Sequence, residues 1–185
     1  MAIPEELLLL HRKRQLRGGG VYLGYGLAGA VLAELLLRNR IVVRSETLSV
    51  FDARFTGDEI LDEALAAIGR SPRQRSVKWW ITSLHQSMKQ LEQRYGQRLP
   101  PGDELVSESL RTRLRNALLL PEGTDAHTAT LIALCEASRI GFLSRDEARH
   151  VRQRLRDAVR TNAIAAAVAA AVTDTEAVLL AMVTG

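Results

Sequence analysis

The segment over residues 22–38 constrains the fold most, because the helix that it predicts is apolar on nearly every side. Leucine and valine recur there at helical spacing, and small residues between them allow neighbouring helices to approach closely. Such a helix must be surrounded by the rest of the chain. The 185 residues, 46% of them hydrophobic, are enough to bury this helix in one domain over residues 1–185.

Glycine and proline divide the remaining chain into further helices. The expected helices cover residues 5–17, 58–68, 76–95, 104–120, 126–139 and 145–162, with a last helix after residue 173. The glycines at 18–20 are expected to end the first helix, and capping-box sequences at Thr56, Ser144 and Thr173 predict three helix starts. The β-branched runs at 41–43 and 48–51 predict one hairpin. The expected fold is mainly α, a single-domain helical bundle with one short β-hairpin.

Residues that could carry catalysis or bind metal are scattered. Cys135 is the single cysteine and lies in an apolar run, and the four histidines fall on different predicted helices without acidic neighbours at ligand spacing. Residues 24–29 match the letters of a dinucleotide fingerprint, but they lack the preceding strand and βαβ unit, so glycine-mediated helix packing is favoured. We therefore predict no enzyme activity, no cofactor and no metal.

The apolar segments do not predict a membrane span. The N-terminus is acidic before its leucine run, which is unlike a secretory signal. Residues 21–37 contain three glycines and Glu34, and residues 163–172 are about half as long as the roughly 20 residues that cross a bilayer. We expect a cytoplasmic protein, peripheral at the cytoplasmic membrane face if it meets a membrane.

Basic residues exceed acidic ones by 25 to 21, a net charge of +4 that permits a phosphate-bearing partner. Trp80 shares a helical face with apolar residues and is expected in the core, which leaves Trp79 freer. One predicted helix carries a basic stripe formed by Arg149, Arg152, Arg156 and Arg160. The favoured interpretation is a solvated helix face, and contact with phosphate or a lipid headgroup is the second.

Residues 26–41, followed by residues 56–65, resemble the Golgi phosphoprotein 3 family, and Trp80-Ile81 and residues 131–134 extend the match. The resemblance implies a mostly helical fold built on a central bundle. It also implies binding to phosphatidylinositol 4-phosphate, since eukaryotic members bind this lipid at the membrane and link Golgi enzymes to vesicle coats. Bacteria carry members too, and the arginine-heavy, alanine-rich composition is typical of a bacterial one.

The resemblance also locates candidate lipid contacts. A tryptophan and an arginine that hold the headgroup in lipid-binding members correspond to Gly19 and Ala28, so these pocket positions are not retained. The later arginine pair falls near residues 82–89, which offer a histidine and a lysine. The interval between residues 84 and 110 is short for the β-hairpin that the family uses in self-association and membrane contact. The candidates for a lipid headgroup or anionic surface are Arg12, Arg14, Arg17, Tyr22, Tyr25, His85 and Lys89.

The expected function is that of a peripheral membrane-binding or adaptor protein with an altered headgroup pocket. Anionic or phosphoinositide lipid is the expected partner, a protein client is a further one, and self-association stays open. One alternative is a nucleic-acid-binding regulator that uses the hairpin at 41–51 and the basic stripe, although the helix before the hairpin is too apolar for recognition. A purely protein-binding helical scaffold is the other alternative.

Overall fold

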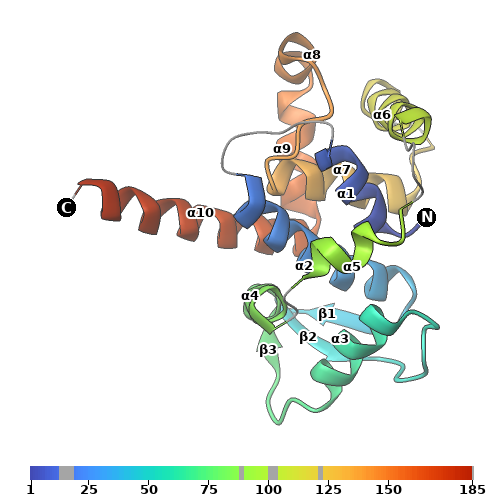
Figure 1. The fold of residues 1–185 in the computed structure, drawn as a ribbon, viewed down its shortest axis with the longest axis vertical. Coiled ribbons are helices and arrows are strands. Elements are labelled where there is room, and N and C mark those ends of the chain that lie inside the picture. The colour runs from blue at the N-terminus through green and yellow to red at the C-terminus, as the bar shows by residue number, and fades with distance from the viewer. Residues whose placement is uncertain (13–18, 88–89, 100–103, 121–122, 185) are drawn as a thin grey trace.

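The computed structural model describes residues 1–12, 19–87, 90–99, 104–120 and 123–184. Within these residues lie ten helices and three short strands, which confirms the mainly α class (Figure 1). The elements in chain order are α1 (Ile3–Arg12), α2 (Gly19–Leu37), β1 (Ile41–Arg44), β2 (Thr47–Val50), α3 (Glu59–Gly69), β3 (Arg75–Ser76), α4 (Val77–Ser87), α5 (Leu91–Gly96), α6 (Glu104–Leu119), α7 (Ala126–Ala137), α8 (Arg145–His150), α9 (Arg152–Thr161) and α10 (Ala163–Thr184).

Helix α2 lies at the centre, as its all-round apolar character predicts. It packs against α1, α3, α4, α7 and α10. Gly29 allows the close approach of α10, because a Cβ at this position would overlap the Val168 side chain. Residues 24–29 thus lie inside a helix, with no strand before them among the residues that the structure describes, and the prediction of glycine-mediated helix packing is confirmed.

The predicted hairpin is confirmed and has one more strand than expected. Strands β1 and β2 pair antiparallel, with Val43 opposite Leu48. Ser45 and Glu46 both have positive φ, at 46° and 64°, as a two-residue turn between right-twisted strands requires. The third strand, β3, pairs through Thr47 opposite Ser76. Because β3 has only two residues, its sequence carries no alternation that could have predicted it.

Several predicted helix boundaries are wrong. Helix α2 starts at Gly19, so two of the glycines expected in a loop are helical, while residues 13–18 lie outside the described ones. The helix expected at 76–95 is two helices, α4 and α5, and Gln90 before α5 has a φ of 79°. The helix expected at 145–162 is also divided, because Val151 separates α8 from α9.

The three capping-box sequences behave differently. Ser144 forms the full box with Glu147, as predicted. At the start of α3 the N-cap is Asp58, whose carboxylate accepts from two backbone N–H groups, while the Thr56 hydroxyl binds Asp62. Thr173 caps nothing, because its hydroxyl donates to the Ala169 carbonyl inside the continuous helix α10.

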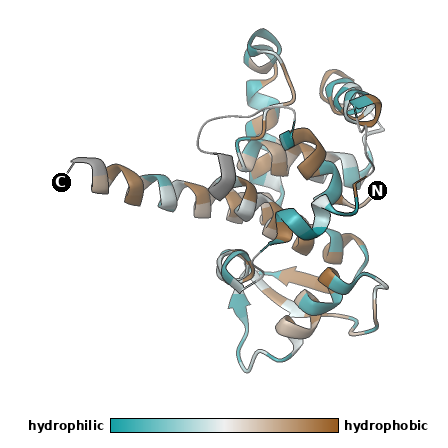
Figure 2. Cartoon of the chain, viewed as in Figure 1, coloured by the Kyte–Doolittle hydropathy of each residue, from teal (hydrophilic) through white to brown (hydrophobic). Residues whose placement is uncertain are grey.

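Helix α10 is therefore longer than predicted. One face of its first half is buried through Ile164, Val168 and Val172, whereas its C-terminal end projects from the molecule and is rich in hydrophobic residues (Figures 1 and 2). Residues 163–182 are long and apolar enough to cross a membrane by length and composition, and 28% of the most apolar window is buried. The expectation that no such segment exists relied on a helix start at Thr173 and is wrong in that respect.

Candidate functional site

A cavity of about 730 Å³ lies between the end of α1, the first half of α2, the end of α4, and α5. Its mixed lining has a charged residue from α1, an imidazole from α4 and several amides from the α5 region. The described lining residues are Arg12, Gly24, Leu27, His85, Gln90, Leu91, Glu92, Gln93, Gly96 and Gln97.

The α4 side of the cavity is formed by His85. Gly24 on α2 makes room for the imidazole, since a Cβ there would overlap two of its ring atoms. The ring of Tyr25 lies beside the imidazole, with centroids 4.4 Å apart and planes tilted by 41°. Burial lowers the pKa of His85, so the imidazole is neutral at pH 7 and offers one donor and one acceptor.

The opposite side is formed by the end of α1 and by α5. Arg12 ends α1, and its Nη2 donates to the Gly96 carbonyl at 3.3 Å. Glu92 brings a carboxylate, and Gln93 and Gln97 bring amides that both donate and accept. The described lining therefore joins one guanidinium and one carboxylate with neutral hydrogen-bonding groups.

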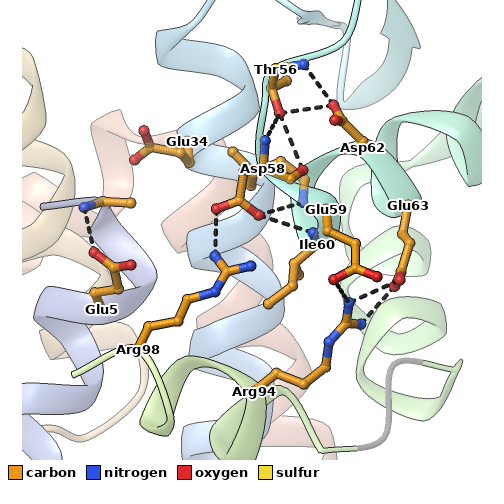
Figure 3. Close-up of polar contacts among 12 residues, drawn as sticks. Glu5, Glu34, Thr56, Asp58, Glu59, Ile60, Asp62, Glu63, Arg94 and Arg98 are labelled. Atoms are coloured by element: carbon orange, nitrogen blue, oxygen red, sulfur yellow. Dashed lines mark hydrogen bonds and ion pairs between the residues drawn. The ribbon is translucent and has the colours of Figure 1, made fainter.

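Helix α5 is held in place by ion pairs with α3 and with the residue that precedes α3 (Figure 3). Arg94 donates to both carboxylate oxygens of Glu63, at 2.7 and 2.9 Å, and lies 3.6 Å from Glu59. Arg98, just beyond α5, pairs with Asp58 at 2.6 Å. The hydrogen bonds from Arg94 lower the pKa of Glu63, so the pair stays charged at neutral pH. These contacts fix α5 to the start of α3, and with it the wall of the cavity.

The structure brings together three of the predicted lipid-contact residues. Arg12 and His85 line the cavity, and Tyr25 packs directly against His85. Tyr22 is half-buried and packs on the core. Arg14, Arg17 and Lys89 lie outside the described residues.

Two positions matched to the family pocket have other roles here. Ala28 is fully buried in the core, so it presents no donor to a ligand, and Gly19 is the first residue of α2. Sequence reasoning missed Gly24 and the three glutamines, Gln90, Gln93 and Gln97. The glutamines carried no distinct signal, because polar residues at such spacing are typical of any solvated helical face.

The remaining predicted residues lie elsewhere. Cys135 is fully buried, which raises the pKa of its thiol, and the described residues contain no group of three or more acidic, histidine or cysteine side chains that could hold a metal ion. Trp80 is buried and Trp79 is 42% exposed, as predicted. The basic stripe is divided between α8 and α9, and Arg160 lines a cavity that Glu46 of the hairpin turn also lines.

These features define a mainly helical protein with a cavity of mixed polar and apolar lining between its central helix and a short helix anchored by ion pairs. The chain belongs to the Golgi phosphoprotein 3 (GPP34) family, whose model matches residues 3–105 and 96–175. The comparison with curated proteins gave no match. The two matched segments meet at 96–105, between α5 and α6, and the second ends within α10 before its projecting end.

Proposed function

We propose that this protein is a peripheral membrane-binding or adaptor protein that holds an anionic lipid headgroup in the cavity between α1, α2, α4 and α5. The observation that carries the proposal is the meeting of Arg12 and His85 at one cavity, since both were candidates on sequence grounds alone. The family to which the chain belongs binds lipids and proteins. The cytoplasmic face of a membrane is the proposed location.

The lining supports binding of a headgroup with limited selectivity. A phosphorylated inositol needs several convergent charge-assisted donors. Ala28 offers none, and Glu92 would repel a second phosphate. Arg12, the neutral donor on His85 and the glutamine amides suit a single phosphate better, and we propose that simple anionic lipids bind about as well as phosphatidylinositol 4-phosphate.

Binding rather than catalysis is the proposed role of this cavity. Its described lining contains no serine, threonine or cysteine nucleophile that His85 could activate. The ring of Tyr25 packs against the imidazole of His85, with centroids 4.4 Å apart. These side chains can orient and hold an anion.

Vesicle co-sedimentation tests the proposal. The protein is mixed with neutral phosphatidylcholine vesicles, with vesicles that also contain phosphatidylserine, and with vesicles that also contain phosphatidylinositol 4-phosphate, at low and physiological salt. We expect binding to both anionic kinds, weaker at higher salt. Sedimentation only with the phosphoinositide vesicles would show specific headgroup recognition and contradict the proposed limited selectivity. Absence of sedimentation with any anionic vesicle would refute the proposal.

A pair of charge-matched variants locates the binding site. Gln93→Glu adds a carboxylate to the cavity, and Gln74→Glu adds the same charge on an exposed loop residue outside it. We expect the first to weaken binding to phosphatidylserine vesicles about tenfold, because a like charge then faces the headgroup. The second should change binding less than about twofold, as expected for a distant, screened charge. Equal losses would place the site elsewhere.

A further inference from the structure

We propose that the projecting end of α10, Ala177–Met182, inserts into the lipid of the membrane. This inference rests on the proposed membrane function and names the element that enters the bilayer. All six residues are exposed apolar side chains, among them Leu180 at 65% and Met182 at 75% exposure. The family match ends at residue 175, so this segment lies beyond the matched region.

The projecting end is apolar on every side. Successive residues of an α-helix are about 100° apart, so six of them cover the whole circumference. A helix that fills a protein groove needs only one apolar stripe at a spacing of three and four. Residues 177–185 contain no charged side chain. An apolar surface without a polar face suits lipid, which closes around a helix from all sides.

The size of the projecting end also favours lipid over a second copy of the chain. Six helical residues are about 9 Å long, and a helix about 10 Å wide offers roughly 300 Å² of lateral surface over that length. A stable protein interface buries about 800 Å² on each partner. The end is too small for such an interface, and it is shorter than the roughly 15 Å depth of one leaflet's hydrocarbon.

Ion pairs with the body neutralise the acidic residues at the base of the projecting end. Asp174 pairs with Lys78 of α4 at 2.5 Å, and Glu176 pairs with Arg139 at 3.2 Å. Between them, the hydroxyls of Thr175 and Tyr25 are hydrogen-bonded at 3.2 Å. These two carboxylates therefore repel an anionic membrane less than free ones would, and the base of the end is fixed to the body.

Arginines flank the base on the side of α9. Arg139, Arg156 and Arg160 line a groove of about 250 Å³ that Val159 and Val172 also line. The side chains of Arg139 and Arg160 are 58% and 78% exposed and pair with Glu176 and Asp157. Each pair leaves further guanidinium N–H donors that can bind lipid phosphates. Guanidinium groups around an apolar helix end are the arrangement expected where a helix enters an anionic membrane surface.

The first half of α10 limits insertion to this end. Ile164, Val168 and Val172 are each at most 1% exposed, and Val168 fills the space left by Gly29. A span by the whole helix would require these side chains to leave the core. Insertion of Ala177–Met182 alone requires no change in the core.

A single fluorescent label tests the insertion. Met182→Cys is labelled with an environment-sensitive nitrobenzoxadiazole dye, while the fully buried Cys135 stays unreactive. The control carries the dye at Leu105→Cys, an 85% exposed position on α6, away from the projecting end (Figure 1). With phosphatidylserine vesicles we expect the fluorescence intensity of the dye to rise severalfold and its emission to shift to the blue at position 182 only.

The possible outcomes separate this inference from the proposed function. The labelled protein could sediment with vesicles while the dye at position 182 reports water, or while the emission shifts equally at position 105. Either result overturns the insertion and leaves membrane binding intact. Absence of sedimentation overturns both. A shift at 182 that grows with protein concentration without vesicles overturns the insertion in favour of self-association.

Paired leucines provide a matched functional test. Leu179→Asp/Leu180→Asp adds two charges to the projecting end, where the leucines are 50% and 65% exposed. Leu119→Asp/Leu120→Asp adds the same charges at the end of α6, at 52% and 74% exposure. We expect the first pair to weaken vesicle binding at least about tenfold and the second less than about twofold, with unchanged circular dichroism for both. Equal effects would overturn the insertion.

Discussion

The imidazole of His85 lies in the space that a Cβ atom on Gly24 would need. The two residues come from different helices, α2 and α4, and both line the same cavity. The absence of a side chain at one position thus determines where the imidazole lies at the other. The same feature explains why a glycine occurs within an otherwise well-packed helix.

Gly24→Ala is expected to displace His85 and to lower the free energy of unfolding by about 1–3 kcal/mol, as overpacking does. Gly69→Ala is the control, because its Cβ would meet only Val50 at an ordinary 3.8 Å, and a gain of about 0.5 kcal/mol is expected. Urea unfolding measures both. In a His85→Ala background the loss caused by Gly24→Ala should disappear. Persistence of the loss there would show that the clash is with another group.

Gln90 lines the cavity with a left-handed backbone, φ 79°, which is unfavourable for a side chain-bearing residue. Gln90→Gly should therefore raise the free energy of unfolding by about 1 kcal/mol. It should also weaken lipid binding, because an amide is lost from the lining. Thermal unfolding and vesicle sedimentation measure the two effects. A variant that is less stable would show that the glutamine side chain supports the fold.

Asp58 has two roles at the start of α3, where it caps the helix and pairs with Arg98. Asp58→Asn keeps the cap, whereas Asp58→Ala removes both interactions. We expect the alanine variant to be about 1 kcal/mol less stable than the asparagine variant in urea unfolding. Indistinguishable variants would mean that the ion pair, and not the cap, carries the contribution of this residue.

The pair of His127 and Glu6 makes stability depend on pH. Their 2.8 Å hydrogen bond raises the pKa of His127 above 6.5, although burial acts against this. Stability from the raised pKa is complete below pH 6.5 and is lost as pH rises through the folded-state pKa. Burial also opposes ionisation of Glu6, but hydrogen bonds from His127 and Arg113 outweigh it and lower its pKa below 4.5. The stability contributed by the lowered pKa of Glu6 is lost as pH falls through the pKa of Glu6 in the folded state.

We therefore expect the pair to stabilise the fold most between about pH 4.5 and pH 6.5. Urea midpoints at about pH 5.5 and pH 8 test this in the native protein and in His127→Gln. The decrease from the lower to the higher pH should be larger in the native protein. Equal decreases would show that other groups cause the pH dependence.

Local sequence patterns predicted the elements that are determined by their own residues. The central helix, the hairpin and the capping box at Ser144 are of this kind. Thr173 shows the limit, because a capping sequence starts a helix only where the preceding residues are not already helical. Residues 163–172 are helical, so the Thr173 hydroxyl donates to the Ala169 carbonyl instead.

The candidate site was predictable only in part for a related reason. Charge and resemblance indicated Arg12 and His85, but Gln93 and Gln97 follow the pattern of any solvated helical face. Their position at a cavity depends on how Arg94 and Arg98 fix α5 to α3, through partners about 30 to 40 residues earlier in the chain. Contacts at such separation leave no local pattern in the sequence.

The continuity of α10 joins the projecting end to the wall of the cavity. The helix runs unbroken from Ile164, Val168 and Val172, which are buried in the core, to the exposed end. At the base of that end the hydroxyls of Thr175 and Tyr25 are hydrogen-bonded, and the ring of Tyr25 packs against His85 at the cavity wall. A substitution at Thr175 or Tyr25 would therefore affect both the projecting end and the cavity, so variants at these two positions do not distinguish the two proposals.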